Sequence, residues 1–132
     1  MTRLLVTTLI TVLLSMLFLI ANINYRQKAQ FSEGAQGEKS GNFMVALTGY
    51  ESAIRMYLPF SSRVELSAQR IWKLGETAEF QGDTERALIA YRSLRSAFYA
   101  VRWLRQPGDT WISRCDKKIA TLAPQRKGTS HE

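Results

Sequence analysis

The sequence of 132 residues predicts an all-α protein in which an N-terminal transmembrane helix precedes helices packed as antiparallel neighbours. Three observations support this class. Residues 4–23 are uncharged and mostly apolar. After them, apolar residues recur every three or four positions, as on one face of a helix, and no alternating run of strand length occurs. About 100 residues follow the apolar run, which is enough for one modest domain.

The run from Leu4 to Ile23 has the length that a helix needs to cross the hydrocarbon core of a bilayer, about 20 residues. Its hydroxyl groups can bond to carbonyls of the preceding turn. A cleaved signal peptide is the alternative, but it needs a shorter apolar run and a pair of small residues before the cleavage point, and neither is present. We therefore expect a retained signal anchor over residues 1–25.

The charges beside this run give little indication of its orientation, because Arg3 and the amino terminus nearly balance Arg26 and Lys28. A short basic leader before an apolar run is typical of a signal anchor with a cytoplasmic N-terminus. We expect a single-pass protein of the inner (plasma) membrane, with the lipid bilayer around residues 4–23. The soluble domain is then periplasmic or extracytoplasmic.

The first two soluble helices differ in how strongly the sequence predicts them. Residues 24–39 are polar and contain Gly34 and Gly37, each of which weakens a helix by about 1 kcal/mol relative to alanine. Asn42 is a typical N-cap for the second helix, whose apolar residues keep helical spacing until Pro59.

Capping residues and prolines bound two further helices. Ser62 and Glu65 form an S-x-x-E capping box, which predicts a third helix up to Phe80. Asp83 caps a fourth helix that extends until Pro107.

The last amphipathic run predicts a fifth helix from Trp111 to Leu122, ended by Pro124. Cys115 lies in its apolar row, which predicts a buried, inert thiol. Residues 123–132 are typical of a disordered basic tail.

Two stretches repeat one pattern, G-[ND]-x-x-x-A-L-x-x-Y. Gly41 to Ala53 reads GNFMVALTGYESA, and Gly82 to Leu94 reads GDTERALIAYRSL. The glycine permits a tight turn between two helices, Asn or Asp caps the second helix, alanine permits close helix approach, and tyrosine fills the groove.

With these residues the chain resembles the tetratricopeptide repeat (TPR) family over residues 28–104. Its pattern spaces W, L-G, Y, a turn glycine, A, F or Y, and P over about 34 residues. The matching positions are Gly34, Gly41, Ala46, Tyr50, Ala53 and Pro59 in the first unit and Ile71, Leu74, Gly75, Ala78, Gly82, Ala87 and Tyr91 in the second. The chain departs from the pattern in that the first unit lacks the Trp and Leu, Trp72 is displaced by one position, and the units lie 41 residues apart.

The resemblance implies a TPR-like α-solenoid over residues 26–122 with a C-terminal capping helix. In this family the first helix of each pair lines a groove that holds a partner's peptide or helix. By position, the groove residues are Lys28, Phe31, Glu38, Gln69, Trp72, Glu76 and Glu79. We prefer Trp72 as the anchor, because aromatic residues dominate interface energetics; packing inside the domain is the alternative.

Positive charge gathers in the second half of the chain, where ten lysines and arginines between residues 86 and 127 face two acids. A basic surface is predicted opposite the apolar stripe of the fourth helix, formed by Arg92, Arg95, Tyr99 and Arg102. A solvated face is the simplest interpretation. The functional interpretation is docking on anionic lipid headgroups or on an acidic partner surface. The residues that extend the positive field are Arg114, Lys117, Lys118, Arg126 and Lys127.

Enzymatic chemistry has no support in the sequence, which offers one cysteine, and one histidine (His131) without ligand neighbours. We expect no enzyme activity, cofactor, metal, small-molecule substrate or nucleic-acid partner. The expected function is that of a membrane-anchored adaptor whose partner is a protein. This adaptor would be an accessory or assembly subunit of a transport, secretion or energy-transducing membrane complex. The alternative is a membrane-surface module whose basic helices bind anionic lipid.

Overall fold

The computed structural model describes residues 1–128, which form five helices and no strand. The helices are α1 (Thr2–Lys39), α2 (Phe43–Arg55), α3 (Ser62–Phe80), α4 (Thr84–Ala100) and α5 (Asp109–Gly128). The predicted all-α class is therefore confirmed over these residues.

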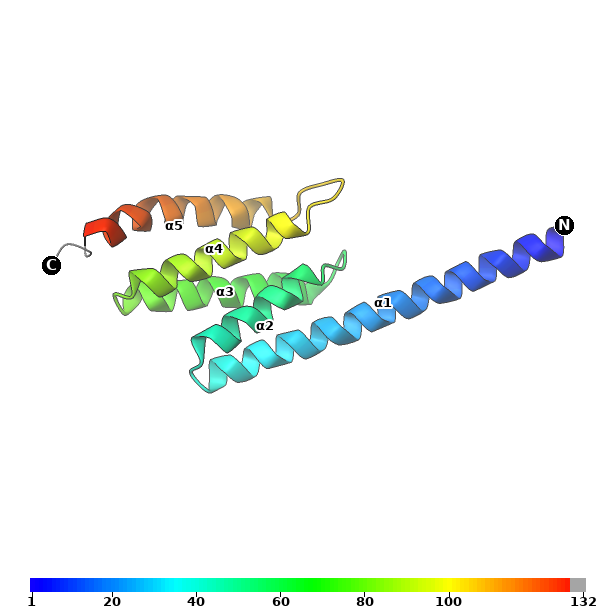
Figure 1. The fold of residues 1–132 in the computed structure, drawn as a ribbon, viewed down its shortest axis with the longest axis horizontal. Helices are drawn as coiled ribbons and strands as arrows, with labels where there is room; N and C mark the ends of the chain where they lie inside the picture. Colours follow the sequence, from blue (N-terminus) through cyan, green and yellow to red (C-terminus); the bar gives the residue numbers. More distant parts are fainter. Residues whose placement is uncertain (129–132) are drawn as a thin grey trace.

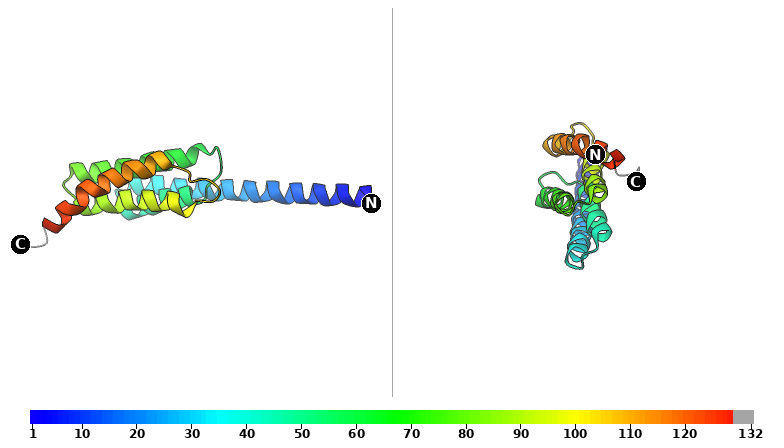
Figure 2. Two further views of the ribbon diagram at one scale, coloured as in Figure 1. Left: turned by 90° about the horizontal axis from the view of Figure 1, so that it is seen from above. Right: turned by 90° about the vertical axis from the view of Figure 1, so that its left-hand side faces the viewer.

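The C-terminal half of α1 and the other four helices form one body, from which the N-terminal half of α1 projects (Figure 1). Viewed end on, α1 with α2, then α3 with α4, and then α5 follow one another along one direction (Figure 2). Each helix packs against the next in sequence, and α2 also contacts α4. The body is thus a stack built in chain order.

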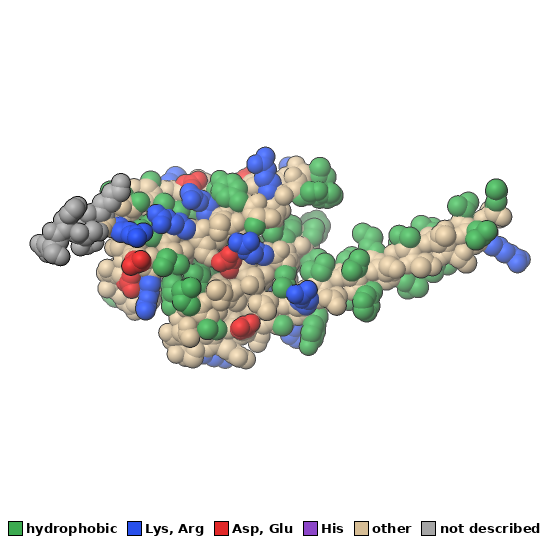
Figure 3. Space-filling model, viewed as in Figure 1, with side chains coloured by type: hydrophobic (Ala, Val, Ile, Leu, Met, Phe, Trp, Pro, Cys, Tyr) green, Lys and Arg blue, Asp and Glu red, His purple; other side chains and the backbone are tan. Residues whose placement is uncertain are grey.

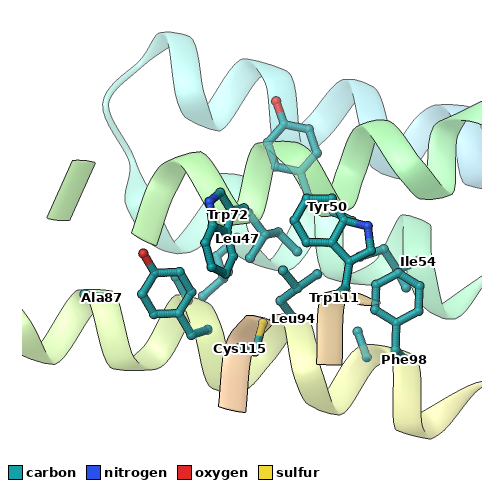
Figure 4. Close-up of a cluster of buried hydrophobic side chains, with 14 of the residues drawn as sticks. Leu47, Tyr50, Ile54, Trp72, Ala87, Leu94, Phe98, Trp111 and Cys115 are labelled. Carbon is teal, nitrogen blue, oxygen red and sulfur yellow. The ribbon is translucent and has the colours of Figure 1, made fainter. Parts of the chain in front are cut away.

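One hydrophobic core joins these helices. Its side chains come from α2 to α5, while Phe31 and Ala35 of α1 pack against its edge. Figure 4 shows the centre of this cluster, in which Cys115 and Trp111 of α5 lie over Leu94 of α4. The fifth helix therefore closes the core of the α3–α4 pair.

Helix α1 is a single unbroken helix of 38 residues, about 57 Å long at 1.5 Å per residue. Its residues up to Arg26 are exposed, and it is long and apolar enough to cross a membrane. Figure 3 shows hydrophobic side chains along the projecting part. The hydroxyls of Thr7, Thr8, Thr11 and Ser15 donate to carbonyls of the preceding turn at 2.8–3.0 Å, as expected.

The glycines that weaken α1 by propensity are its contact points with α2. A Cβ atom at Gly34 would lie 2.8 Å from the ring of Tyr50, and one at Gly37 would overlap the backbone nitrogen of Ala46. Gly49 of α2 faces the backbone of Gly34 just as closely. Close backbone packing therefore outweighs the propensity cost.

The turns before α2 and α4 follow the repeated sequence pattern. Gly41 and Gly82 have φ values of +71° and +76°. The side chains of Asn42 and Asp83 each accept the backbone N–H three residues on, at 3.2 and 3.0 Å. Both predicted N-caps are confirmed.

The predicted Ser62–Glu65 capping box is wrong. The N-cap of α3 is Ser61, and its hydroxyl donates to Gln27 Oε1 of α1 at 2.7 Å. The carboxylate of Glu65 accepts the indole N–H of Trp111 at 3.0 Å. The N-cap residue Ser61 and the predicted box residue Glu65 are thus engaged by α1 and α5.

Helix α4 ends at Ala100, earlier than the predicted end before Pro107. The side-chain amide of Gln106 folds back and donates to the carbonyl of Phe98 at 2.9 Å, which caps the helix. Leu104, which lies inside the predicted helix, is 83% exposed in the α4–α5 loop.

Helix α5 continues through Pro124 to Gly128, so the predicted end at Pro124 is wrong. The missing proline N–H leaves only the carbonyl of Ala120 without its helical donor, and Ala120 is exposed to water. Of the predicted tail, residues 129–132, His131 included, lie outside the described residues.

Replacement of Gly37 by alanine tests the close contact between α1 and α2. Helix propensity alone predicts that Gly37→Ala stabilises the protein by about 1 kcal/mol. Because the added Cβ meets backbone atoms, we expect instead a loss of about 1–3 kcal/mol in the free energy of unfolding. The measurement is urea unfolding of the full chain in detergent, followed by circular dichroism.

The matched control for this variant is Gln36→Ala, at the exposed neighbouring position, which we expect to stay within about 0.5 kcal/mol of wild type. Stabilisation by Gly37→Ala would contradict the close packing of the two helices.

Candidate protein-interaction surface

The first repeat unit places a carboxylate between α1, α2 and α3. Tyr50 Oη donates to Glu38 Oε2 at 2.7 Å, and Arg70 Nη1 of α3 lies 3.3 Å from Glu38 Oε1. The Tyr50 ring packs on Phe31 with 5.3 Å between centroids and covers Gly34. Glu38 therefore joins the first helix pair to the start of the second.

The second unit repeats this arrangement 41 positions later. Tyr91 Oη donates to Glu79, and Lys118 Nζ of α5 lies 2.7 Å from Glu79 Oε1. The Tyr91 ring packs on Trp72 with 4.8 Å between centroids, and a Cβ at Gly75 would lie 2.7 Å from it. The repeat found in the sequence thus corresponds to a repeated set of contacts.

Both tyrosine hydroxyls are held as protonated donors. Burial raises the pKa of Tyr50 and of Tyr91 well above the usual value, and the hydrogen bonds to Glu38 and Glu79 raise it further. At any physiological pH the two carboxylates therefore keep their tyrosine partners.

Trp72 is a core residue in this structure, with 9% of its surface exposed. Its indole N–H donates to Glu76 Oε1 at 2.7 Å, and the guanidinium of Arg114 lies 4.2 Å from its ring centroid. Trp111 packs beside it at 5.9 Å. These contacts correspond to the packing alternative and leave little of the ring for a partner.

The remaining predicted groove residues are dispersed over α1 and α3. Lys28, Gln69 and Glu76 are exposed, whereas Phe31 is half-buried against Tyr50. Gln69 donates to Glu65 on its own helix at 3.3 Å. Of the predicted set, Trp72, Glu76 and Glu79 are grouped on one part of α3.

Beside Trp72 and Glu79 the surface forms a hollow of about 390 Å³ between α3 and α5. It is lined by Trp72, Glu79, Arg114, Lys117, Lys118, Thr121 and Leu122. Three cations of α5 thus line this hollow together with Trp72. We call this the α3–α5 hollow.

Arg114, Lys117 and Lys118 were predicted as part of the positive field, but not as residues that line a groove together with Trp72 and Glu79. A local signal was present, since these positions are spaced by three and four residues and therefore share one helix face. Their position over Trp72 depends on how α5 packs on α3 and α4, which the spacing does not reveal.

The predicted basic surface is only partly assembled. Arg92 and Tyr99 are exposed on α4, but Arg95 is half-buried and pairs with Asp116 of α5 at 2.8 Å. Arg102 lies beyond the end of α4, in the α4–α5 loop, because the helix ends early. The four residues therefore do not form the continuous helical face that the sequence predicted.

The described part of the chain holds neither a cluster of metal ligands nor an exposed cysteine. Among residues 1–128, no cluster of three or more His, Cys, Asp or Glu side chains is placed to hold a metal ion. Cys115 is fully buried, and burial raises the pKa of its thiol to about 12.

Comparison with protein-family models, with curated proteins and with solved structures gives no match to this chain. The structure itself defines the class: an all-helical protein whose long apolar N-terminal helix can span a membrane.

The buried thiol gives a pH-dependent prediction. Cys115 has a pKa of about 12 in the native state and an ordinary value of 9.0 when exposed. Below about pH 9 both states keep the proton, whereas between 9 and 12 only the native state does, so stability falls as pH rises through that window. At pH 8 we expect iodoacetamide to label native Cys115 at least about 100-fold more slowly than the urea-unfolded chain. Equal labelling rates, measured by mass spectrometry, would show that the thiol is accessible.

Proposed function

We propose that this chain is a non-catalytic, membrane-anchored adaptor for protein–protein interaction. In this proposal α1–α2 and α3–α4 are antiparallel pairs of a TPR-like solenoid, α5 caps it, and the N-terminal half of α1 is the anchor. The observation that carries the proposal is the duplicated contact set, in which Tyr50 and Tyr91 each join a glutamate, an aromatic ring and a glycine. Repeated units of this kind stack to present extended binding surfaces.

The partner of this adaptor is another subunit of an inner-membrane complex, for which the chain is an accessory or assembly subunit. The body lies on the periplasmic or extracytoplasmic side in this proposal. Tethering to the bilayer raises the effective concentration of the body near other membrane proteins, so a modest contact area is sufficient for association.

The α3–α5 hollow is the proposed contact region. Lys118 is paired with Glu79, whereas Lys117 is exposed and the guanidinium of Arg114 lies over the ring of Trp72. An acidic helix or peptide fits this surface, because its carboxylates can pair with the cations of α5. This assigns partner binding to α5 as well as α3.

The lipid-binding alternative has weaker support. It needs a continuous basic face on α4, but Arg95 is paired with Asp116 and Arg102 is outside the helix. We therefore favour the adaptor.

Site-specific photo-cross-linking in native membranes tests the proposed contact region. We expect a probe in place of Thr121, which lines the α3–α5 hollow, to give a discrete adduct with one membrane protein. Lys117→Glu should reduce that adduct at least about fivefold, because it places a negative charge where the partner is acidic.

The matched control is Arg92→Glu, which makes the same charge change at an exposed position of α4 and should leave the adduct intact. Loss of the adduct in both variants, or its absence in the wild type, would contradict binding at the hollow.

A further inference from the structure

Two neighbouring loops of the body expose large apolar side chains. The α2–α3 loop, residues 56–61, carries Phe60, which is fully exposed. The α4–α5 loop, residues 101–108, carries Trp103 and Leu104, with 85% and 83% of their surfaces exposed. Both loops line one hollow of about 710 Å³, so they form a single surface. We call Phe60, Trp103 and Leu104 the loop patch.

This patch lies next to the point where α1 leaves its apolar run. Arg63 Nη1, at the start of α3, donates to Asn24 Oδ1 at 2.6 Å, and Asn24 is the first residue after the run. Ser61 donates to Gln27, one turn further along α1. Figure 1 shows both loops at the end of the body from which α1 projects.

Phe60 combines an exposed ring with an unfavourable backbone conformation. Its φ of +66° lies in the left-handed region, which bulky residues rarely adopt. The side chain gains no burial within the body in exchange for this cost. A conformation of this kind is favourable when something outside the body covers the ring.

The charged residues beside the loop patch indicate what covers it. Arg102 and Arg105 are exposed on either side of Trp103 and Leu104, and Arg26 is exposed on α1 two residues beyond Asn24. Tryptophan and other amphipathic or apolar side chains are favoured at the interface of a bilayer, and arginines beside them pair with lipid phosphates. The bilayer necessarily lies at the level where a transmembrane helix emerges. A soluble protein partner has no need to bind at that level.

We propose that the α2–α3 and α4–α5 loops rest on the same bilayer that α1 crosses. Phe60, Trp103 and Leu104 enter the interfacial region, and Arg102 and Arg105 contact phosphates of anionic lipids. This inference rests on the proposed membrane anchor. It goes beyond the adaptor function because it gives the body a second attachment and a fixed orientation, with the α3–α5 hollow on the side of the body.

Tryptophan quenching in vesicles tests the contact. The full chain is reconstituted in phosphatidylcholine and phosphatidylglycerol vesicles whose acyl chains are brominated near the carbonyl. Trp72 and Trp111 are buried in the core, so Trp103 is the tryptophan open to the surroundings. We expect the brominated lipid to quench part of the emission, and we expect Trp103→Phe to abolish that part. Arg102→Gln with Arg105→Gln should weaken the quenching.

Phe80 provides the matched control, because it is 94% exposed at the opposite end of the body, where α3 turns into α4 (Figure 1). In the variant that combines Trp103→Phe with Phe80→Trp, the exposed tryptophan should be quenched by aqueous iodide and not by brominated lipid.

Three results would overturn the inference. Quenching of Trp103 by iodide alone would place the patch in water, available to a protein. Equal lipid quenching at positions 80 and 103 would indicate unspecific adsorption. Failure of the chain to float with vesicles in alkaline carbonate would refute the anchor itself. A chain that floats but shows no lipid quenching of Trp103 would refute the loop contact alone.

Discussion

The buried side chain of Gln27 fixes how the membrane-compatible part of α1 is joined to the body. Its Nε2 donates to the carbonyls of Ala53 and Met56 at the end of α2, at 3.1 and 3.0 Å, and its Oε1 accepts the hydroxyl of Ser61. The last carbonyls of a helix lack intrahelical donors, and a buried side-chain amide requires hydrogen-bond partners. The amide of Gln27 and the last carbonyls of α2 therefore satisfy each other. Gln27 lies one turn beyond the apolar run, which therefore ends where the body begins.

The rest of the arrangement follows from this connection. Because α1 is both the apolar helix and the first helix of the stack, the body has no flexible linker to it. Glycine contacts hold α2 close to α1. Glu38 of α1 then pairs with Arg70 of α3, and Glu79 of α3 pairs with Lys118 of α5. The α2–α3 and α4–α5 loops lie beside the apolar run, while the α3–α5 hollow lies farther from that run.

Local signals in the sequence predicted most elements, and tertiary contacts explain where prediction failed. Asn42 and Asp83 act within one turn of chain, so their caps were readable. Ser61 and Glu65 instead bond to Gln27 and Trp111, 34 and 46 residues away, which no local motif encodes. The groove was predicted less well than the fold, because the helix that carries Trp72 could be predicted from the sequence but the packing of α5 over Trp72 could not. The two glycines of α1 looked like helix weaknesses and are packing contacts.

This arrangement requires that α1 is continuous from its apolar run into the body, and hydrogen exchange tests this directly. The full chain in lipid nanodiscs would be exposed to deuterated water and the amides of residues 24–30 followed by mass spectrometry. Continuity predicts that they exchange as slowly as the amides in the core of α2. Exchange at the rate of an unstructured peptide would mean that a flexible linker joins the apolar helix to the body.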